Sequence, residues 1–458
     1  MKNLIDRLNP NSIAICGVTQ SRLLGTTLVV IVALGLASCG DMAKLPVSAG
    51  VGPNPQIPEP EKSLIPTVDI APAKGWPQNG KPVAANGLTV NRFADGLQHP
   101  RSVYVLPNGD VLVAETAAPS KPEDGKGIKG WFYKMAQKRA GASQPSANRI
   151  TLLRDSNGDG IVDTRTTFLE GLNSPYGMAV VGNDFYVANT DSVMRFRYEA
   201  GQTRITDNGT KVAELPGGPL NHHWTKNLVA SENGSKLYVS VGSNSNVGEN
   251  GIDKEEGRAA IWEIDTKTGA HRIFASGLRN PNGLAFEPRT HTLWTAVNER
   301  DELGSDLVPD YMTSVRDGGF YGWPYSYFGQ HVDTRVNPQR PDLVERAIIP
   351  DYALGPHTAS LGLTAAQGVN LPAPYKEGMF VGQHGSWNRK PQSGYDVIFV
   401  PFSDGKPSGS PVNVLTGFLS DAGEAMGRPV GVAIDKRGAL LVADDVGNTI
   451  WRVTAATG

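Results

Sequence analysis

The sequence predicts an all-β fold, a six-bladed β-propeller, from its repeats, its composition and its turn residues. One unit recurs in six segments: a Gly-Leu loop, a polar corner, an apolar strand, a turn and a second strand. Glycine (53 residues) and proline (33) are abundant and only 19% of residues are charged, which favours an all-β protein with many turns. Since one unit cannot bury both faces of its sheet, neighbouring units pack in a ring. The unequal intervals between copies weigh against the alternative, an open β-solenoid.

The clearest copy spans 274–300, with predicted strands at 283–286 and 292–297. An antiparallel hairpin places the start of its first strand and the end of its second at one edge. The same holds for every copy, so one end of the ring, which we call the mouth, gathers the polar corners. The residues that this copy brings to the mouth are Arg279, Asn280, Asn298, Glu299 and Arg300.

The other copies follow the same pattern, and the last strand, 449–453, closes the ring by pairing with the blade that begins near Leu88. Two insertions interrupt the pattern, at 117–148 and 301–347. The first contains a short basic amphipathic helix, and the second holds an aromatic run that either stacks on a flat ligand or forms a satellite core. The remaining predicted strands lie at 102–106, 111–114, 184–188, 228–230, 236–241, 378–382 and 439–443.

The N-terminus predicts export and a lipid anchor. An apolar run, 23–36, follows Arg22 and leads into Leu-Ala-Ser-Cys39, which resembles a bacterial lipobox. Gly40 after the cysteine favours the outer membrane, on the periplasmic side. An uncleaved membrane anchor is the alternative.

The chain therefore divides into three parts: a signal peptide over 1–38, a lipidated Cys39 with an extended Pro/Gly-rich tether over 39–87, and the propeller over 88–458. The formal net charge of -2, without basic runs, gives no sign of nucleic-acid binding.

The mouth is predicted to gather charged side chains from separate blades. A guanidinium holds a carboxylate through a bidentate fork, and a histidine acts as a general base near neutral pH. Strand ends are polar in any propeller because they meet water, so a single such residue predicts little. Two arginines and two histidines on different blades favour a ligand site. These four are Arg279, Arg428, His223 and His384.

Four motifs in order resemble the glucose/sorbosone dehydrogenase family, closest to its sorbosone-dehydrogenase-like branch. They are Gly277-Leu-Arg-Asn-Pro-Asn-Gly-Leu-Ala-Phe, Gly319-Phe-Tyr-Gly-Trp-Pro, His384-Gly-Ser-Trp-Asn-Arg, and Gly427-Arg-Pro-Val-Gly-Val-Ala with Leu441-Val-Ala-Asp-Asp. The resemblance covers roughly Leu88 to Val453. Members of this family are six-bladed propellers, and many use pyrroloquinoline quinone (PQQ) with calcium.

The resemblance implies a role for each matching residue. His223 matches the catalytic base that takes the sugar hydroxyl proton while hydride passes to the quinone. The family places an aspartate beside this base, but Ser243 stands at that position, so the carboxylate that would orient the ring is missing. The implied PQQ contacts are Arg279, Asn280, Asn298, Arg389 and Arg428, and the implied backbone ligands of a PQQ-bound calcium are Glu299 and Arg300.

A second candidate calcium site lies in a predicted hairpin turn. Oxygen-bearing side chains alternate as in the first half of an EF-hand loop, with Gly160 after the third. The closing glutamate is absent, since Thr166 stands there. The candidate ligands are Asp155, Asn157, Asp159 and Asp163; a metal-free turn is the alternative.

The resemblance implies an enzyme of the cell envelope that depends on PQQ and calcium. Its substrate would be a sugar or a sugar-derived aldehyde, and its electron acceptor is not identified by the sequence. One alternative is a calcium-dependent lactonase or other hydrolase, with Glu115, Asn189 and Asn298 as ligands. The other is a non-catalytic module that binds glycans or envelope proteins.

Overall fold

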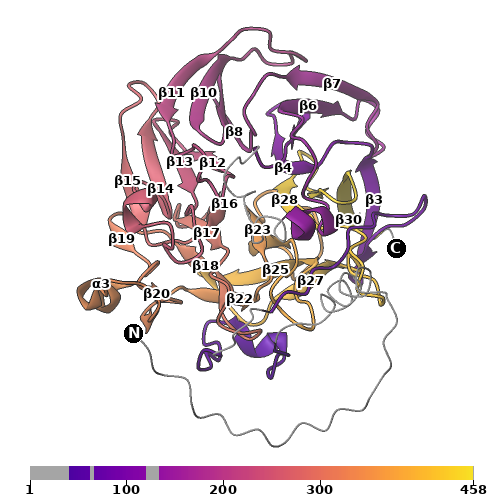
Figure 1. Cartoon of the computed structure of the whole chain (residues 1–458). Coiled ribbons are helices and arrows are strands. Elements are labelled where there is room, and N and C mark those ends of the chain that lie inside the picture. Colours follow the sequence, from indigo (N-terminus) through magenta and orange to yellow (C-terminus); the bar gives the residue numbers. More distant parts are fainter. Residues whose placement is uncertain (1–40, 62–66, 120–133, 457–458) are drawn as a thin grey trace, which may run out of the picture. The chain divides into compact units, whose positions relative to one another are not determined.

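The computed structural model describes residues 41–61, 67–119 and 134–456. The predicted signal peptide and Cys39 lie outside these ranges. Six sheets stand around a central axis as the blades of a propeller (Figure 1). The predicted fold class is therefore confirmed and the solenoid is excluded.

Each blade is antiparallel and starts with its innermost strand. Blade 1 contains β4 (Pro100–Val105), β5 (Val111–Glu115), β6 (Arg149–Arg154) and β7 (Thr164–Leu169). Blade 2 contains β8 (Gly177–Val181), β9 (Asp184–Ala188), β10 (Ser192–Arg197) and β11 (Thr210–Glu214). Blade 3 contains β12 (Leu228–Ala230), β13 (Lys236–Val241), β14 (Ala260–Asp265) and β15 (His271–Ser276), with β19 (Gly319–Phe320) added in parallel.

The other three blades recruit strands from elsewhere in the chain. Blade 4 contains β16 (Pro281–Phe286), β17 (Leu293–Val297), β18 (Pro309–Ser314), β22 (Tyr352–Pro356) and β1 (Val51–Gly52). Blade 5 contains β23 (Ser360–Ala365), β24 (Gly378–Gln383), β25 (Asp396–Ser403), β27 (Val412–Thr416) and β2 (Val83–Ala84), with β26 (Lys406–Pro407) beside β25. Blade 6 contains β28 (Pro429–Ile434), β29 (Leu440–Asp444), β30 (Thr449–Ala455) and β3 (Leu88–Ala94).

The ring closes through β3, which forms the outer strand of blade 6. It pairs antiparallel with β30, so that Leu88 faces Ala455 and Val90 faces Val453. The predicted closure is confirmed, and so are the predicted first and second strands of the blades. The outer strands β10, β11, β14, β15, β25 and β27 were not predicted.

Glycine in the repeated unit allows the inner strands to approach one another. A Cβ on Gly362 would lie 2.0 Å from the carbonyl oxygen of Val430, and one on Gly431 would lie 2.7 Å from that of Arg101. Both distances are shorter than any real contact of a Cβ. The inner strands therefore converge at the axis only because this position has no side chain.

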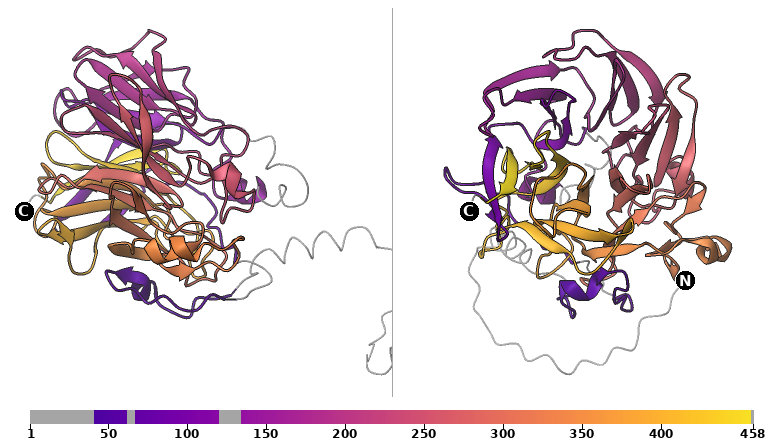
Figure 2. Two further views of the ribbon diagram at one scale, coloured as in Figure 1. Left: turned by 90° about the vertical axis from the view of Figure 1, so that its left-hand side faces the viewer. Right: turned by 180° about the vertical axis from the view of Figure 1, so that it is seen from behind.

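The expected extended tether is wrong for the residues that the structure describes. Residues 41–61 run along the edge of the ring (Figure 2), where η1 (Val47–Gly50) precedes β1. Residues 67–87 continue along the ring and contribute β2. This segment, which we call the strap, was predicted to be extended because its proline-rich composition lacks apolar periodicity. The strap is held to the propeller by backbone hydrogen bonds and by single buried residues, and these cannot be predicted from composition.

The second insertion also differs from its prediction. The range 301–347 contains β18, which is an integral strand of blade 4. Its aromatic run is a core and not an exposed platform, because Tyr321, Trp323 and Tyr327 are all buried. The rest of the insertion forms β20 (Ser326–Tyr327), β21 (His331–Val332) and α3 (Pro341–Arg346). In the first insertion the described part is helical over 134–139.

A polar plug divides the central channel. Tyr176 Oη donates to Asn282 Oδ1 at 2.8 Å, and Asn282 Nδ2 donates to Thr225 Oγ1 at 2.8 Å. Below the plug lies a cavity of about 460 Å³ between the inner strands, and above it lies the mouth. Among the described residues, no helix is long and apolar enough to span a membrane.

The strap is fixed to blade 6 by Asp444, which is fully buried. Its carboxylate accepts from the indole N–H of Trp76 at 2.7 Å and of Trp451 at 3.0 Å, and from the backbone N–H of Arg428 and Gly447, both at 2.8 Å. We predict that Asp444→Ala lowers the free energy of unfolding by about 3 kcal/mol or more, because it removes the acceptor of four donors, two of them buried. Urea unfolding measures this.

The matched control is Asp404→Asn, because Asp404 has a φ of 54°, which asparagine tolerates and alanine does not. Asp404 is 88% exposed and pairs with Arg289 at 3.4 Å, so its loss should change the unfolding free energy by less than about 0.5 kcal/mol. Similar losses in the two variants would show that Asp444 does not anchor the strap.

Candidate functional site

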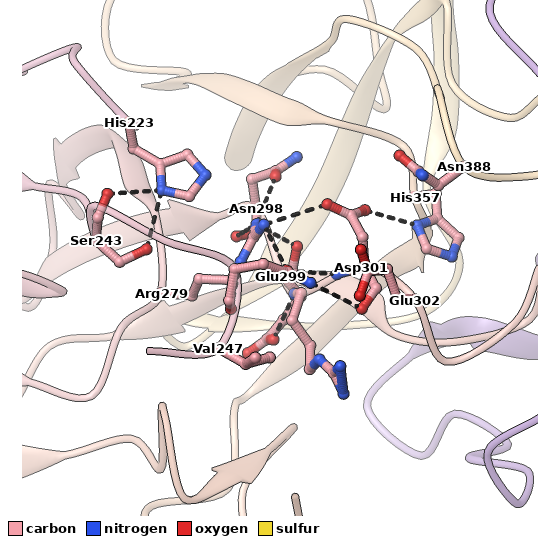
Figure 3. Close-up of polar contacts among 12 residues, drawn as sticks. His223, Ser243, Val247, Arg279, Asn298, Glu299, Asp301, Glu302, His357 and Asn388 are labelled. Atoms are coloured by element: carbon pink, nitrogen blue, oxygen red, sulfur yellow. Dashed lines mark hydrogen bonds and ion pairs between the residues drawn. The ribbon is translucent and has the colours of Figure 1, made fainter. Parts of the chain in front are cut away.

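The mouth is built as expected, from the corner before each inner strand and the residues after each second strand. His223 and Ser243 lie on one side, Arg279 and Asn298 between, and Asp301 with His357 on the other side (Figure 3). The residues of blades 3 and 4 that the sequence placed together are therefore brought together.

His223 is half-buried in the corner before β12. Its Nδ1 lies 2.9 Å from both the carbonyl oxygen and Oγ of Ser243. The carbonyl only accepts, and Ser243 Oγ already donates to the carbonyl of Ser245 at 2.6 Å, so Nδ1 carries the ring proton. The lone pair is therefore on Nε2. Ser243 fixes the tautomer, but as a neutral group it does not stabilise an imidazolium as a carboxylate does.

Arg279 links blades 3 and 4 and is only 2% exposed. Its guanidinium donates to the carbonyl oxygens of Asn246, Asn298 and Glu299, the last at 2.5 Å, and pairs with Asp301 at 3.2 Å. The expectation that it projects into the mouth as an open clamp is not what the geometry shows. The side chain cross-links three loops.

Arg428 and Arg389 are likewise buried. Arg428 donates to the carbonyls of His384 and Ala71 at 3.2 Å each and lies over the ring of Tyr395. Arg389 donates to the carbonyl of Leu45 at 2.9 Å. Both arginines therefore hold the strap against the mouth and do not line it.

Asn280 and Asn298 keep positions at the mouth. Asn298 is half-buried, and its Oδ1 accepts from Arg279 at 3.2 Å. Asn280 is buried, and its side-chain Oδ1 has no hydrogen-bond partner within the described part of the chain. Such an orphaned acceptor is what a bound ligand or water would satisfy.

A cluster around Asp445 brings the predicted His384 together with two residues that were not predicted, His99 and Arg101. Asp445 Oδ2 accepts from Arg101 Nη1 at 2.6 Å, lies 2.9 Å from His384 Nε2 and is 3.6 Å from His99 Nε2. Burial opposes ionisation of Asp445, yet the hydrogen bond from His384 and the Arg101 guanidinium hold its pKa well below its usual range. Aligning the corner 98–101 with 279–282 would have found His99 and Arg101.

Asp301 and His357 form a second carboxylate–histidine pair, but both nitrogens of its ring are used. His357 Nδ1 lies 3.3 Å from Asp301 Oδ1, and Nε2 donates to the carbonyl of Gly304 at 2.9 Å. Burial opposes ionisation of Asp301, yet His357 and Arg279 lower its pKa to about 2. His357 therefore fixes the loop 301–304, and neither of its ring nitrogens is left to accept a proton from a substrate.

Glu299 lies behind the mouth and is buried with Asp310. The backbone N–H of Glu299 donates to Asp310 Oδ1 at 2.9 Å. Burial raises the pKa of Glu299 to about 7 and that of Asp310 to about 6. The Glu299 carbonyl, one of the expected calcium ligands, already accepts from Arg279. The Arg300 side chain pairs with Asp333 at 2.9 Å.

The turn at 155–163 uses its carboxylates for its own backbone. Asp155 accepts from the N–H of Gly158 at 2.7 Å and of Gly160 at 3.0 Å, and Asp163 accepts from that of Ser156 at 2.6 Å. Among the described residues, no three His, Cys, Asp or Glu side chains gather to hold a metal ion.

The hydrolase alternative loses one of its expected ligands. The Glu115 carboxylate accepts from Arg149 at 2.8 Å and also bonds Thr151, so it stays within blade 1.

Comparison with known proteins gives a consistent family signal. The family model described as TrAA12-like matches residues 142–314 and 337–456, more than half of the chain. An uncharacterized protein of Borreliella burgdorferi is 28% identical over 297 residues, which are 63% of this chain and 77% of that protein. A pyrroloquinoline quinone-dependent pyranose dehydrogenase of Coprinopsis cinerea is 22% identical over 361 residues. This match covers 69% of the chain but spans only 44% of that enzyme's length.

Solved structures share the fold. A carbohydrate-active enzyme of family AA12 from Trichoderma reesei has a TM-score of 0.65 at 19% identity, covering 85% of this chain and 99% of that one. The PQQ domain of the Coprinopsis cinerea pyranose dehydrogenase, in its holo form, has a TM-score of 0.64 at 20% identity, covering 84% and 100%.

The raised pKa of Glu299 predicts a pH-dependent stability. In the unfolded chain a glutamate ionises near pH 4.3, and here it ionises at about 7, so the folded state holds the proton over that window. Stability from this group is therefore present below pH 4.3 and is lost as pH rises to about 7, by a few kcal/mol. The pKa of Asp310 is raised to about 6, so ionisation of this group also lowers the stability as pH rises.

Glutamine does not ionise, so Glu299→Gln should remove the loss of stability that ionisation of Glu299 causes. The unfolding free energy of the variant should therefore fall less between pH 5 and pH 8 than that of the wild type. Urea unfolding at the two pH values measures it. The matched control is Glu424→Gln, a partly exposed carboxylate paired with Lys74. If Glu299→Gln and wild type show the same pH dependence, Glu299 is not protonated in the fold.

Proposed function

The chain belongs to the TrAA12-like family, and from this premise we propose that it is a PQQ-dependent oxidoreductase. Its proposed substrate is a sugar or a sugar-derived aldehyde. The support comes from relatives named as PQQ-dependent pyranose dehydrogenase and, over a shorter stretch of 139 residues at 27% identity, as aldose sugar dehydrogenase of Escherichia coli.

The observation that carries the proposal is the fixed tautomer of His223 at the mouth. Its Nε2 holds the lone pair that removal of a hydroxyl proton requires. Oxidation of a sugar hydroxyl also needs an oxidant for the two electrons, and PQQ supplies it when bound. His223 takes the hydroxyl proton in this proposal, and Arg279 acts by holding Asn298 and the 299–301 loop in place.

The residues of the mouth fit a planar polycarboxylic acid. Arg101 is 9% exposed, its guanidinium lies 5.8 Å from the ring centroid of Trp224, and its Nε has no partner within the described residues. We assign Arg101, Asn280 and Asn298 to the cofactor. Arg389 and Arg428 are buried behind the mouth, so they contribute positive potential to the site.

Calcium remains part of the proposal at the Glu299 and Arg300 carbonyls. Backbone carbonyl oxygens are the hard ligands that calcium prefers. Since Arg279 Nη1 donates to the Glu299 carbonyl at 2.5 Å, a cation bound there must share or displace that guanidinium. The turn at 155–163 is kept as a second proposed calcium position, one that would stiffen the hairpin of β6 and β7.

The proposed function is tested by reconstitution. The purified protein is mixed with PQQ, with and without calcium, and the quinone absorbance that remains after gel filtration is measured. Dye reduction is then measured with a panel of sugars and aldehydes. We expect retention of quinone and reduction with at least one sugar. His223→Gln should retain the quinone and lower kcat roughly 100-fold, the scale of a lost general base.

The control variant for this test is His291→Gln, a histidine 64% exposed in the turn between β16 and β17, at the opposite end of that hairpin from the mouth. Absence of quinone retention by the wild-type protein would favour the hydrolase or the non-catalytic binding module. Retention with unchanged kcat in His223→Gln would remove His223 from the reaction.

We also propose that the protein is exported and anchored by a lipid on Cys39 at the periplasmic side of the outer membrane. The support is the Leu-Ala-Ser-Cys39 sequence after an apolar run. Expressed in a diderm bacterium, the wild-type protein should partition with membranes, and Cys39→Ala should remain a larger, unlipidated precursor. Metabolic labelling with a fatty-acid analogue measures it; equal labelling of both forms would contradict the anchor.

A further inference from the structure

The oxidation proposed above releases two protons, and the mouth contains a second histidine suited to take one. Removal of two hydrogens from a CH–OH group yields a carbonyl, two electrons and two protons. One proton leaves the hydroxyl oxygen. The hydrogen on carbon leaves with the electron pair and becomes the second proton when the electrons pass to an acceptor that takes electrons alone.

Five histidines lie around the mouth: His99, His222, His223, His357 and His384. The rings of His222 and His223 contact each other edge to face. His357 uses both ring nitrogens. His99 is 5% exposed and its Nδ1 donates to the carbonyl of Thr116 at 2.8 Å. His384 has 13% of its side chain exposed and lies 2.9 Å from Asp445 through Nε2.

The charge on Asp445 decides the tautomer of His384. Asp445 is ionised, because Arg101 pairs with it at 2.6 Å, so it accepts and Nε2 of His384 donates. The lone pair of His384 is therefore on Nδ1. A carboxylate on the far nitrogen stabilises the imidazolium that forms when Nδ1 takes a proton, which Ser243 does not do for His223.

The groups that face His384 come from blades 1 and 6. Asp445 follows β29, Arg101 and His99 lie at the start of β4, and Arg428 precedes β28 and donates to the His384 carbonyl at 3.2 Å. Burial lowers the pKa of His384 to about 4, and Arg428 and Arg101 add to this effect while Asp445 opposes it. At neutral pH the ring is therefore a neutral proton acceptor that returns its proton readily to solvent.

We propose that His384, backed by Asp445 and Arg101, takes up the second proton of the reaction, the one released as electrons leave the site. The inference rests on the proposed function. PQQ held at the mouth would supply the oxidant for the two electrons. His223 Nε2 would take the hydroxyl proton, and His384 Nδ1 would take the proton that the carbon-bound hydrogen becomes once both electrons have passed to the acceptor. Atoms and charge then balance over one turnover.

The decisive variant is His384→Gln, whose amide N–H replaces Nε2–H toward Asp445 while the basic nitrogen is lost. The reconstituted wild-type protein and variant are compared in two separate steps. Reduction by sugar is followed by quinone absorbance without an acceptor, and reoxidation is followed after mixing with ferricyanide, which takes electrons only. We expect reduction within about 3-fold of wild type and reoxidation at least about 10-fold slower, the scale of a lost proton acceptor.

A readout independent of turnover is the ring tautomer in the cofactor-free protein. Nitrogen-15 NMR at pH 7 should show Nε2 of His384 protonated and Nδ1 unprotonated, and Asp445→Asn should change that assignment or the exchange rate of the Nε2 proton. His291→Gln is the control in all measurements.

The outcomes separate the two proposals. Unchanged reoxidation in His384→Gln, with an active wild-type enzyme, overturns this inference and leaves the proposed function standing. Slower reduction instead of slower reoxidation overturns the assignment to the second proton. A protonated Nδ1 at pH 7 overturns it without any turnover measurement. If the wild-type protein neither retains quinone nor oxidises sugars, the inference falls with the proposed function.

Discussion

Closure of the ring is the constraint on which the site depends. Each inner strand brings one corner to the mouth, and the corners converge only if the first and last blades meet. The pairing of β3 with β30 makes that junction, and it joins residues that lie at opposite ends of the propeller sequence. Small residues on the inner strands then let the six corners approach, as at Gly362 and Gly431. The mouth is therefore a product of closure and not of any single blade.

Two adjacent aspartates at the end of β29 have different roles at this junction. Neighbouring residues of a strand point to opposite sides, so Asp444 and Asp445 face different surroundings. Asp444 accepts from Trp76 of the strap and from Trp451 of β30. Asp445 faces Arg101 and His384 at the mouth. Asp444 holds the strap in place, and Asp445 sets the tautomer of His384 at the mouth. Because the two residues are adjacent, a displacement of one would also displace the other.

The repeated unit made the ring, its closure and the positions of its inner and second strands predictable, because turn residues and apolar alternation are local signals. The outer strands β10, β14 and β25 were missed, since they belong to no repeated motif. The strap was misjudged for a different reason. Its hold on the propeller comes from contacts between distant residues, such as the Ala71 carbonyl with Arg428, and a proline-rich sequence carries no sign of them.

The sequence predicted which residues lie at the mouth, but not the direction in which their side chains point. Strand ends placed Arg279, Asn298 and His223 together, and the structure confirms that they share the mouth. Whether a guanidinium faces the mouth or the surrounding loops depends on which carbonyls lie within reach, and that is set by loop conformation. His384 was predicted for the mouth, but its contacts with Asp445 and Arg101 were not, because the three residues come from blades 5, 6 and 1 and no local pattern pairs them.

The buried arginines of the mouth act mainly through potential. Arg279, Arg389 and Arg428 donate mainly to carbonyl oxygens, which carry no net charge. Arg279 also pairs with Asp301 at 3.2 Å and Arg389 with Asp306 at 3.6 Å, so of the three only Arg428 has no carboxylate partner among the described residues. Burial has the largest effect on each pKa here, and neighbouring charges add to it or oppose it. Arg101 and the hydrogen bond from His384 keep Asp445 ionised against the effect of burial. Burial, with Arg428 and Arg101, keeps His384 neutral at pH 7, and burial raises the pKa of Glu299 to about 7. A mouth with these three states attracts an anion, keeps a lone pair ready on a neutral ring, and supplies the carboxylate that steadies the ring once it is protonated.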